Sequence, residues 1–186
     1  FFFNLLKYKD LIYMFVKRDF VTFYKQTILG FSWAIIRPLF SMVIFTIVFG
    51  NLAKVPSDGI PYPLFSYVAL VPWTYFSTAM GKSSLSLVNS VGIFTKVYFP
   101  RIIIPLTSVI AGLIDFLIAF SIIIILMIWY KVPPSLNILI IPYLMLIMVL
   151  FSSSVGMIFS TLAIQYRDIR HGIQFVSQLL MYATPV

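Results

Sequence analysis

Long apolar segments alternate with short polar ones along almost the whole 186-residue chain. A helix needs about 20 apolar residues to cross roughly 30 Å of hydrocarbon. Five segments are candidates for such helices, and the fifth reaches the end of the sequence: residues 33–52, 64–81, 102–130, 136–164 and 173–186. The pattern therefore predicts an all-α, polytopic integral membrane protein that forms a single transmembrane domain over residues 1–186. We expect the chain to be a piece of a longer protein.

Residues 7–29 differ from these spans because charged side chains recur among the apolar ones. A charged side chain at the bilayer centre costs about 2.5–3.5 kcal/mol, so this segment should not insert. The spacing predicts an amphipathic helix lying along the cytoplasmic interface. A basic anchor with no further role is the simpler alternative. The residues expected to act at this surface are Lys17, Arg18, Tyr24 and Lys25.

Composition and charge support a membrane location and orient the chain. Hydrophobic residues make up 61% and the mean hydropathy is +1.05, whereas soluble domains are about 45–50% apolar. Of 13 Lys and Arg residues, all except Lys54 and Lys131 fall in the amino arm and in the second-to-third and fourth-to-fifth connections. The positive-inside rule places these connections and the amino end in the cytoplasm. The net charge of +8 is thus accounted for by membrane lipids, and we do not expect nucleic-acid binding.

Few residue types that support catalysis are present. The chain has no cysteine, one histidine (His171) and five scattered aspartates, which leaves little material for a metal site or an acid–base pair. Gly81-Lys82-Ser83 resembles the end of a phosphate-binding loop, but Phe76 stands where that loop needs a glycine. We expect no ATP, metal or other cofactor on this chain. An enzyme acting on lipid-linked substrates is a weaker alternative.

Two features of the spans could serve transport. Tyr67, Trp73, Tyr75 and Phe76 crowd the second span, where they form either an interfacial aromatic belt or a channel wall along which sugar rings slide. Asp115 lies near the middle of the third span. An intramembrane carboxyl group either bonds to a neighbouring helix or belongs to a substrate pathway. In an ion-coupled transporter, Asp115 would be part of a proton or sodium relay.

Residues 82–101 have an unusual composition for a membrane connection, because small polar residues alternate with apolar ones. Such a segment can form a short helix outside the bilayer whose apolar ridge docks into a groove of a partner. A plain connector would be shorter and more charged. The expected docking residues are Asn89, Ser90, Val91, Ile93, Phe94 and Lys96.

The order of several short motifs resembles the permeases of type-2 ABC exporters for O-antigen, capsule and teichoic-acid chains. The matching pieces are Arg18-Asp19 with residues 24–34 and Arg37-Pro38, then residues 61–65, Pro72-Trp73, and residues 95–101, 166–170 and 184–186. Each piece alone is unspecific, but together they occur in the family's order and cover essentially the whole chain.

The resemblance implies properties that composition does not provide. It implies a homodimer enclosing a channel in the bacterial cytoplasmic membrane, with six spans per subunit, of which the sixth is missing from this chain. A separate cytoplasmic ATPase would bind ATP and Mg²⁺, and residues 89–96 would form part of the element that couples to it. The substrate would be a polyprenyl-linked glycan. Export of a drug or lipid by the same class of transporter, or ion-coupled transport, are the alternatives.

Overall fold

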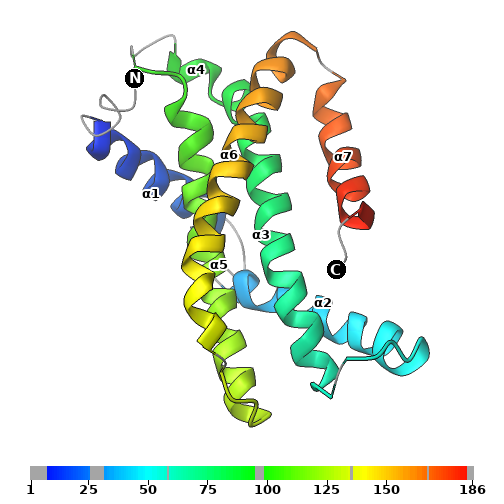
Figure 1. Cartoon of the computed structure of the whole chain (residues 1–186). Coiled ribbons are helices and arrows are strands. Elements are labelled where there is room, and N and C mark those ends of the chain that lie inside the picture. Colours follow the sequence, from blue (N-terminus) through cyan, green and yellow to red (C-terminus); the bar gives the residue numbers. More distant parts are fainter. Residues whose placement is uncertain are drawn as a thin grey trace.

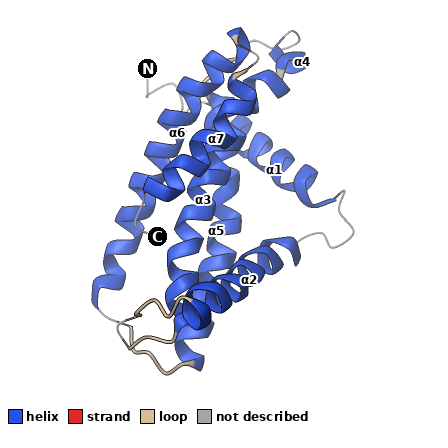
Figure 2. Cartoon of the chain, turned by 90° about the vertical axis from the view of Figure 1, so that its right-hand side faces the viewer, coloured by secondary structure: helices blue, strands red, loops and turns tan. Residues whose placement is uncertain are grey.

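The computed structural model describes residues 8–25, 32–57, 59–94, 99–134, 136–166 and 168–183, and these residues form helices and connecting turns (Figure 2). The elements are α1 (Lys9–Lys25), α2 (Trp33–Phe45), η4 (Thr46–Leu52), α3 (Tyr62–Asn89), α4 (Val91–Phe94), α5 (Ile103–Trp129), η5 (Leu136–Ile140), α6 (Ile141–Gln165) and α7 (Ile169–Ala183). The all-α fold class predicted from the hydrophobic pattern is confirmed.

Helix α3 is the centre of the bundle (Figure 1). It packs most extensively on α5 and α6, and also contacts α2 and α7. Tyr67, Val71 and Tyr75 of α3 meet Val109 and Phe116 of α5 in the larger apolar core. The face of α3 that carries these residues at four-residue spacing is therefore buried within the chain.

Small residues allow α3 and α6 to approach closely. Ser152, Gly156 and Ser160 recur at four-residue spacing on the buried face of α6, which is the small-residue pattern common between membrane helices. A Cβ atom added to Gly156 would lie 2.5 Å from the Cβ atom of Ser83 on α3. The Ser83 hydroxyl in turn donates to the Pro105 carbonyl of α5, at 3.1 Å. Ser83 thus lies at the junction of all three helices.

Three described segments are long and apolar enough to cross a membrane: Trp33–Leu52, Ile103–Trp129 and Ile138–Gln165. They correspond to the first, third and fourth predicted spans. Helix α3 is long enough, but its carboxyl-terminal part carries Lys82 and several serines, and α7 has only 15 residues. The second and fifth spans therefore remain predictions.

The segment predicted as a separate region at 82–101 is divided differently in the structure. Residues 82–89 continue α3 without a break, and the separate helix, α4, contains only Val91–Phe94. Serine does not stop this helix because Ser84 and Ser86 donate to the backbone carbonyls of Met80 and Ser83. The polar half of the segment is thus part of a long helix rather than a loop.

Helix α2 crosses the bundle obliquely and contacts α3 and α5 (Figures 1 and 2). None of its residues is buried within the chain, and Phe40, Val43 and Ile44 are among its exposed apolar side chains. In a membrane protein such a face requires lipid or another protein surface as its environment.

Candidate functional site

A cavity of about 900 Å³ lies between α1, α3, α5 and α7. Three basic side chains, those of Arg18, Lys82 and Arg170, line it together with the acidic Asp19 and Asp115. Most of the remaining polar lining is serine, threonine and amide side chains. The cavity is therefore charged, with one more basic than acidic group, although apolar side chains such as Phe20, Leu85 and Ile104 also line it.

Helix α1 forms one wall of this cavity and rests on α5 through an apolar face. Leu11, Ile12 and Phe15 pack against a cluster that includes Phe99 and Ile104, and the Phe15 and Phe99 ring centroids are 5.5 Å apart. The opposite side of α1 is exposed. A helix is present where the sequence predicts one. Its exposed side carries Tyr13 and Met14 as well as Lys17, so its position along the membrane interface remains a prediction.

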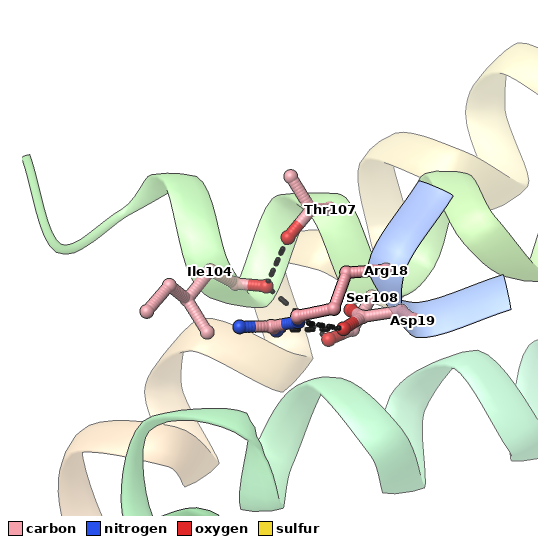
Figure 3. A network of polar contacts seen from close by, with 5 residues as sticks. All are labelled: Arg18, Asp19, Ile104, Thr107 and Ser108. Atoms are coloured by element: carbon pink, nitrogen blue, oxygen red, sulfur yellow. Dashed lines mark hydrogen bonds and ion pairs between the residues drawn. The ribbon is translucent and has the colours of Figure 1, made fainter. Parts of the chain in front are cut away.

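The charged pair on α1 lies against the first turns of α5 (Figure 3). Arg18 Nη2 is 2.6 Å from Asp19 Oδ1, and the Arg18 guanidinium lies 4.7 Å from the centroid of the Phe15 ring. On α5, the hydroxyls of Thr107 and Ser108 donate to the Ile104 carbonyl, at 2.9 and 3.2 Å. The α5 hydroxyls are thus bonded to their own helix, and the charges on this side of the cavity come from α1.

The last turn of α1 is joined to α5 by a hydrogen bond. The Tyr24 hydroxyl donates to Asp115 Oδ1, across 91 positions of the sequence. Burial, followed by the hydrogen bond and the charge of Asp115, raises the pKa of Tyr24 above its usual value of about 10. Tyr24 therefore remains a protonated donor. Of the two roles that the sequence left open for Asp115, contact with a neighbouring helix is the one the geometry displays.

A second, smaller pocket of about 90 Å³ lies between α2, α3 and α5. Tyr24, Lys82 and Asp115 line both this pocket and the large cavity. Arg37 also lines the smaller pocket, with its guanidinium 5.2 Å from the Trp33 ring centroid. The three shared residues lie at the boundary between the two spaces.

The predicted channel aromatics lie mainly in the interior of the chain. Tyr67 and Tyr75 are 0% and 6% exposed. The Tyr75 hydroxyl donates to the Val109 carbonyl at 3.3 Å, and Phe76 stacks on Phe151 of α6 with centroids 5.5 Å apart. Trp73 is partly exposed beside Phe76. These rings contact other helices of the same chain, so a role in a channel wall remains a prediction.

The predicted docking residues are only partly described. Asn89 and Ser90 line the large cavity, Val91 is exposed, and Ile93 packs beside Leu87 and Phe99. Lys96 and the side chains of Lys25 and Phe94 lie outside the described residues. Docking onto a partner remains a prediction for this segment.

Helix α7 carries a polar stripe that the hydrophobic pattern of the sequence did not predict. Arg170, Gln174 and Gln178 recur at four-residue spacing and are all exposed, and the first two line the large cavity. The signal was present in the sequence, because two amides interrupt the fifth apolar segment at that spacing. Helix α7 buries only Ile173. Among the described residues, no group of three or more His, Cys, Asp or Glu side chains could hold a metal ion.

Comparison with known proteins agrees with this architecture. The family model of the ABC-2 type transporter matches residues 10–186. The O-antigen export system permease protein RfbA of Myxococcus xanthus is 28% identical over 184 residues, which cover 98% of this chain and 70% of the relative. Two proteins of the same name from Klebsiella pneumoniae are 31% and 32% identical over 178 residues, covering 95% of this chain and 68% of each relative. The chain therefore belongs to the membrane-domain family of ABC-2 type transporters.

Proposed function

We propose that this chain is the channel-forming permease subunit of an ATP-driven exporter that moves a polyprenyl-linked polysaccharide across the bacterial cytoplasmic membrane. The similar proteins from Myxococcus and Klebsiella are named as O-antigen export permeases, which supports a glycan rather than a drug or a lipid alone. The observation in the structure that carries the proposal is the polar stripe of α7, which is continuous with the large cavity.

Exposed amides are costly in hydrocarbon because their donors and acceptors find no partners there. Gln174 and Gln178 therefore need water, another protein surface or a polar substrate beside them. A glycan presents hydroxyl groups that both donate and accept hydrogen bonds, as an amide does. A row of amides can exchange these bonds as a polymer advances, without holding it in one position.

One chain leaves such a stripe exposed, so a closed channel requires a second surface. The unburied α2 face, with Phe40, Val43 and Ile44 exposed, provides apolar area that a second copy of the chain could cover. A homodimer would then place two cavities and two α7 stripes around one path. The amino end and α1 would lie on the cytoplasmic side.

The energy would come from a separate cytoplasmic ATPase that binds ATP and Mg²⁺, and this chain would be the transport subunit, for which we expect no cofactor. Its docking element would include α4, where Val91 is exposed. Closure of the ATPase can drive transport only if α4 binds the two nucleotide states with different affinity, since an equal affinity shifts no equilibrium.

The proposal is tested by replacing the α7 amides. We expect Gln174→Leu combined with Gln178→Leu to reduce polymer export at least about tenfold when the permease and ATPase are produced together, because the path loses its donors and acceptors. Phe175→Leu is the matched control, since Phe175 is an exposed apolar residue of the same helix. Export unchanged by the double substitution, or export that continues with a hydrolysis-deficient ATPase, would contradict the proposal.

A further inference from the structure

Among the described residues, helix α1 is attached to α5 by contacts of two kinds. Near its middle, Phe15 is held by apolar contact with Phe99 and the residues around it. In its last turn, Tyr24 is held by the hydrogen bond to Asp115. Apolar contact is non-directional and allows sliding or rotation, whereas a hydrogen bond specifies distance and angle. The orientation of the carboxyl-terminal end of α1 therefore depends on the polar attachment.

The other side of α1 does not supply a comparable restraint among the described residues. Tyr13, Met14 and Val21 are 66%, 65% and 40% exposed along that side. Helix α1 makes its extensive described contacts with α5 alone among the long helices. It is thus held from one side, in a geometry that permits its end to swing outward when the polar attachment is lost.

The hydrogen bond between Tyr24 and Asp115 lies where the two cavities meet. Tyr24 and Asp115 both line the large cavity and the smaller pocket between α2, α3 and α5. Since the bonded pair lies, together with Lys82, at the boundary between these spaces, outward movement of Tyr24 would open that boundary. The connected space would extend from the basic side chains at Arg18 and Arg170 to Trp33 and Arg37 at the start of α2.

We infer that Asp115 is a positioning residue that acts through Tyr24: it holds the end of α1 at the boundary between the two cavities and keeps them separate. The positioning role is independent of the transported molecule, whereas its effect on export rests on the function proposed above. It requires Asp115 to accept a hydrogen bond, and it does not require Asp115 to carry or transfer a proton.

The inference is tested by measuring the distance between α1 and α5 in the full-length permease with its ATPase, reconstituted in lipid nanodiscs. Val21→Cys and Leu117→Cys place spin labels on exposed positions of the two helices, and the 186 residues contain no competing cysteine. Electron paramagnetic resonance then gives the distance distribution. We expect Tyr24→Phe and Asp115→Leu to raise the ratio of long to short distances about tenfold, as the loss of one partly buried hydrogen bond would.

Conservative and control variants separate positioning from other roles. Asp115→Asn should keep the unsubstituted distribution and export, because the amide oxygen still accepts from Tyr24. Tyr13→Phe, which removes an exposed hydroxyl from the same helix, should also change nothing. The double variant Tyr24→Phe/Asp115→Leu should lengthen the α1–α5 distances no more than Asp115→Leu alone, because each substitution removes the same hydrogen bond.

Two outcomes would overturn the inference. One is an unchanged distance distribution in both Tyr24→Phe and Asp115→Leu. The other is loss of export in Asp115→Asn with normal distances, which would assign Asp115 to an ion relay. Failure of the proposed function is distinguishable from either: the unsubstituted protein would export no polymer, while the distances would still respond to Tyr24→Phe.

Discussion

Gly156 of α6 lies close against Ser83 of α3, and replacing the glycine should test the packing of the whole bundle. A methyl group at Gly156 would lie 2.5 Å from Ser83 Cβ, about 1 Å closer than two carbon atoms pack without repulsion. Ser83 cannot rotate its Cβ away, so the helices must separate. Overpacking of this kind costs about 1–3 kcal/mol, and we expect Gly156→Ala to destabilise the protein by that amount.

Separation of α3 and α6 would also weaken contacts on either side of Gly156. The 3.1 Å hydrogen bond from Ser83 to the Pro105 carbonyl would weaken. The stacked rings of Phe76 and Phe151 would move apart. A larger side chain should therefore act more strongly. We expect Gly156→Leu to prevent assembly of the bundle, so that the protein is degraded or aggregates during purification.

Reversible unfolding in detergent–lipid bicelles measures the effect of Gly156→Ala as a change in the free energy of unfolding. Gly81→Ala is the matched control, because a Cβ atom there meets nothing within 4 Å. It should be neutral or stabilising by about 0.5–1 kcal/mol, since alanine favours the helix. Ser83→Gly should restore part of the stability lost in Gly156→Ala by reopening the space. The reasoning is refuted if Gly156→Ala is as stable as Gly81→Ala.

Three further predictions concern α1, the docking segment and the core. Because the pKa of Tyr24 is raised, the protonated phenol is favoured in the folded protein. The stability that this hydroxyl contributes is complete below pH 10 and is lost as the pH rises through the pKa that Tyr24 has in the folded state. The α1–α5 distances should therefore stay constant up to about pH 10 and lengthen only above it, and Tyr24→Phe should abolish this dependence. Lys96→Glu should reduce co-purification of the ATPase by at least about fivefold while membrane insertion is unchanged; full stoichiometry would show that the coupling element lies elsewhere. Tyr67→Phe should raise the free energy of unfolding by about 1 kcal/mol, because the buried Tyr67 hydroxyl has no hydrogen-bond partner among the described residues; a large loss of export in this variant would instead indicate contact with the substrate.

Local patterns were sufficient to predict the class of protein and the character of its segments. Apolar length predicted three segments that satisfy the requirements for spanning, and the spacing of charged and apolar residues predicted α1. The ordered motifs indicated the transporter family that the comparisons then showed. These properties belong to each segment separately, because solvation by lipid or water acts on a helix according to its own side chains.

The same local reasoning did not establish which faces of the helices meet. Tyr75 and Phe76 are aromatic residues in a span whether they line a channel or pack in a core, and packing against Phe116 and Phe151 was visible only in the assembled chain. Likewise, the polar amides of α7 were treated as part of an apolar segment, although their four-residue spacing was present in the sequence. The spacing of residues in one helix identifies which of its faces is polar or apolar, but it does not identify the helix that packs against that face.

The amino-acid sequence by itself determined that this chain is a helical membrane protein with an amphipathic amino-terminal helix, because burial in lipid depends on composition and spacing within one segment. Only the tertiary structure decided that Asp115 bonds to Tyr24, 91 positions away, and that Ser83 fits against Gly156. Such contacts require two helices to approach at a particular depth and rotation. That geometry results from packing the whole bundle, which no single segment encodes.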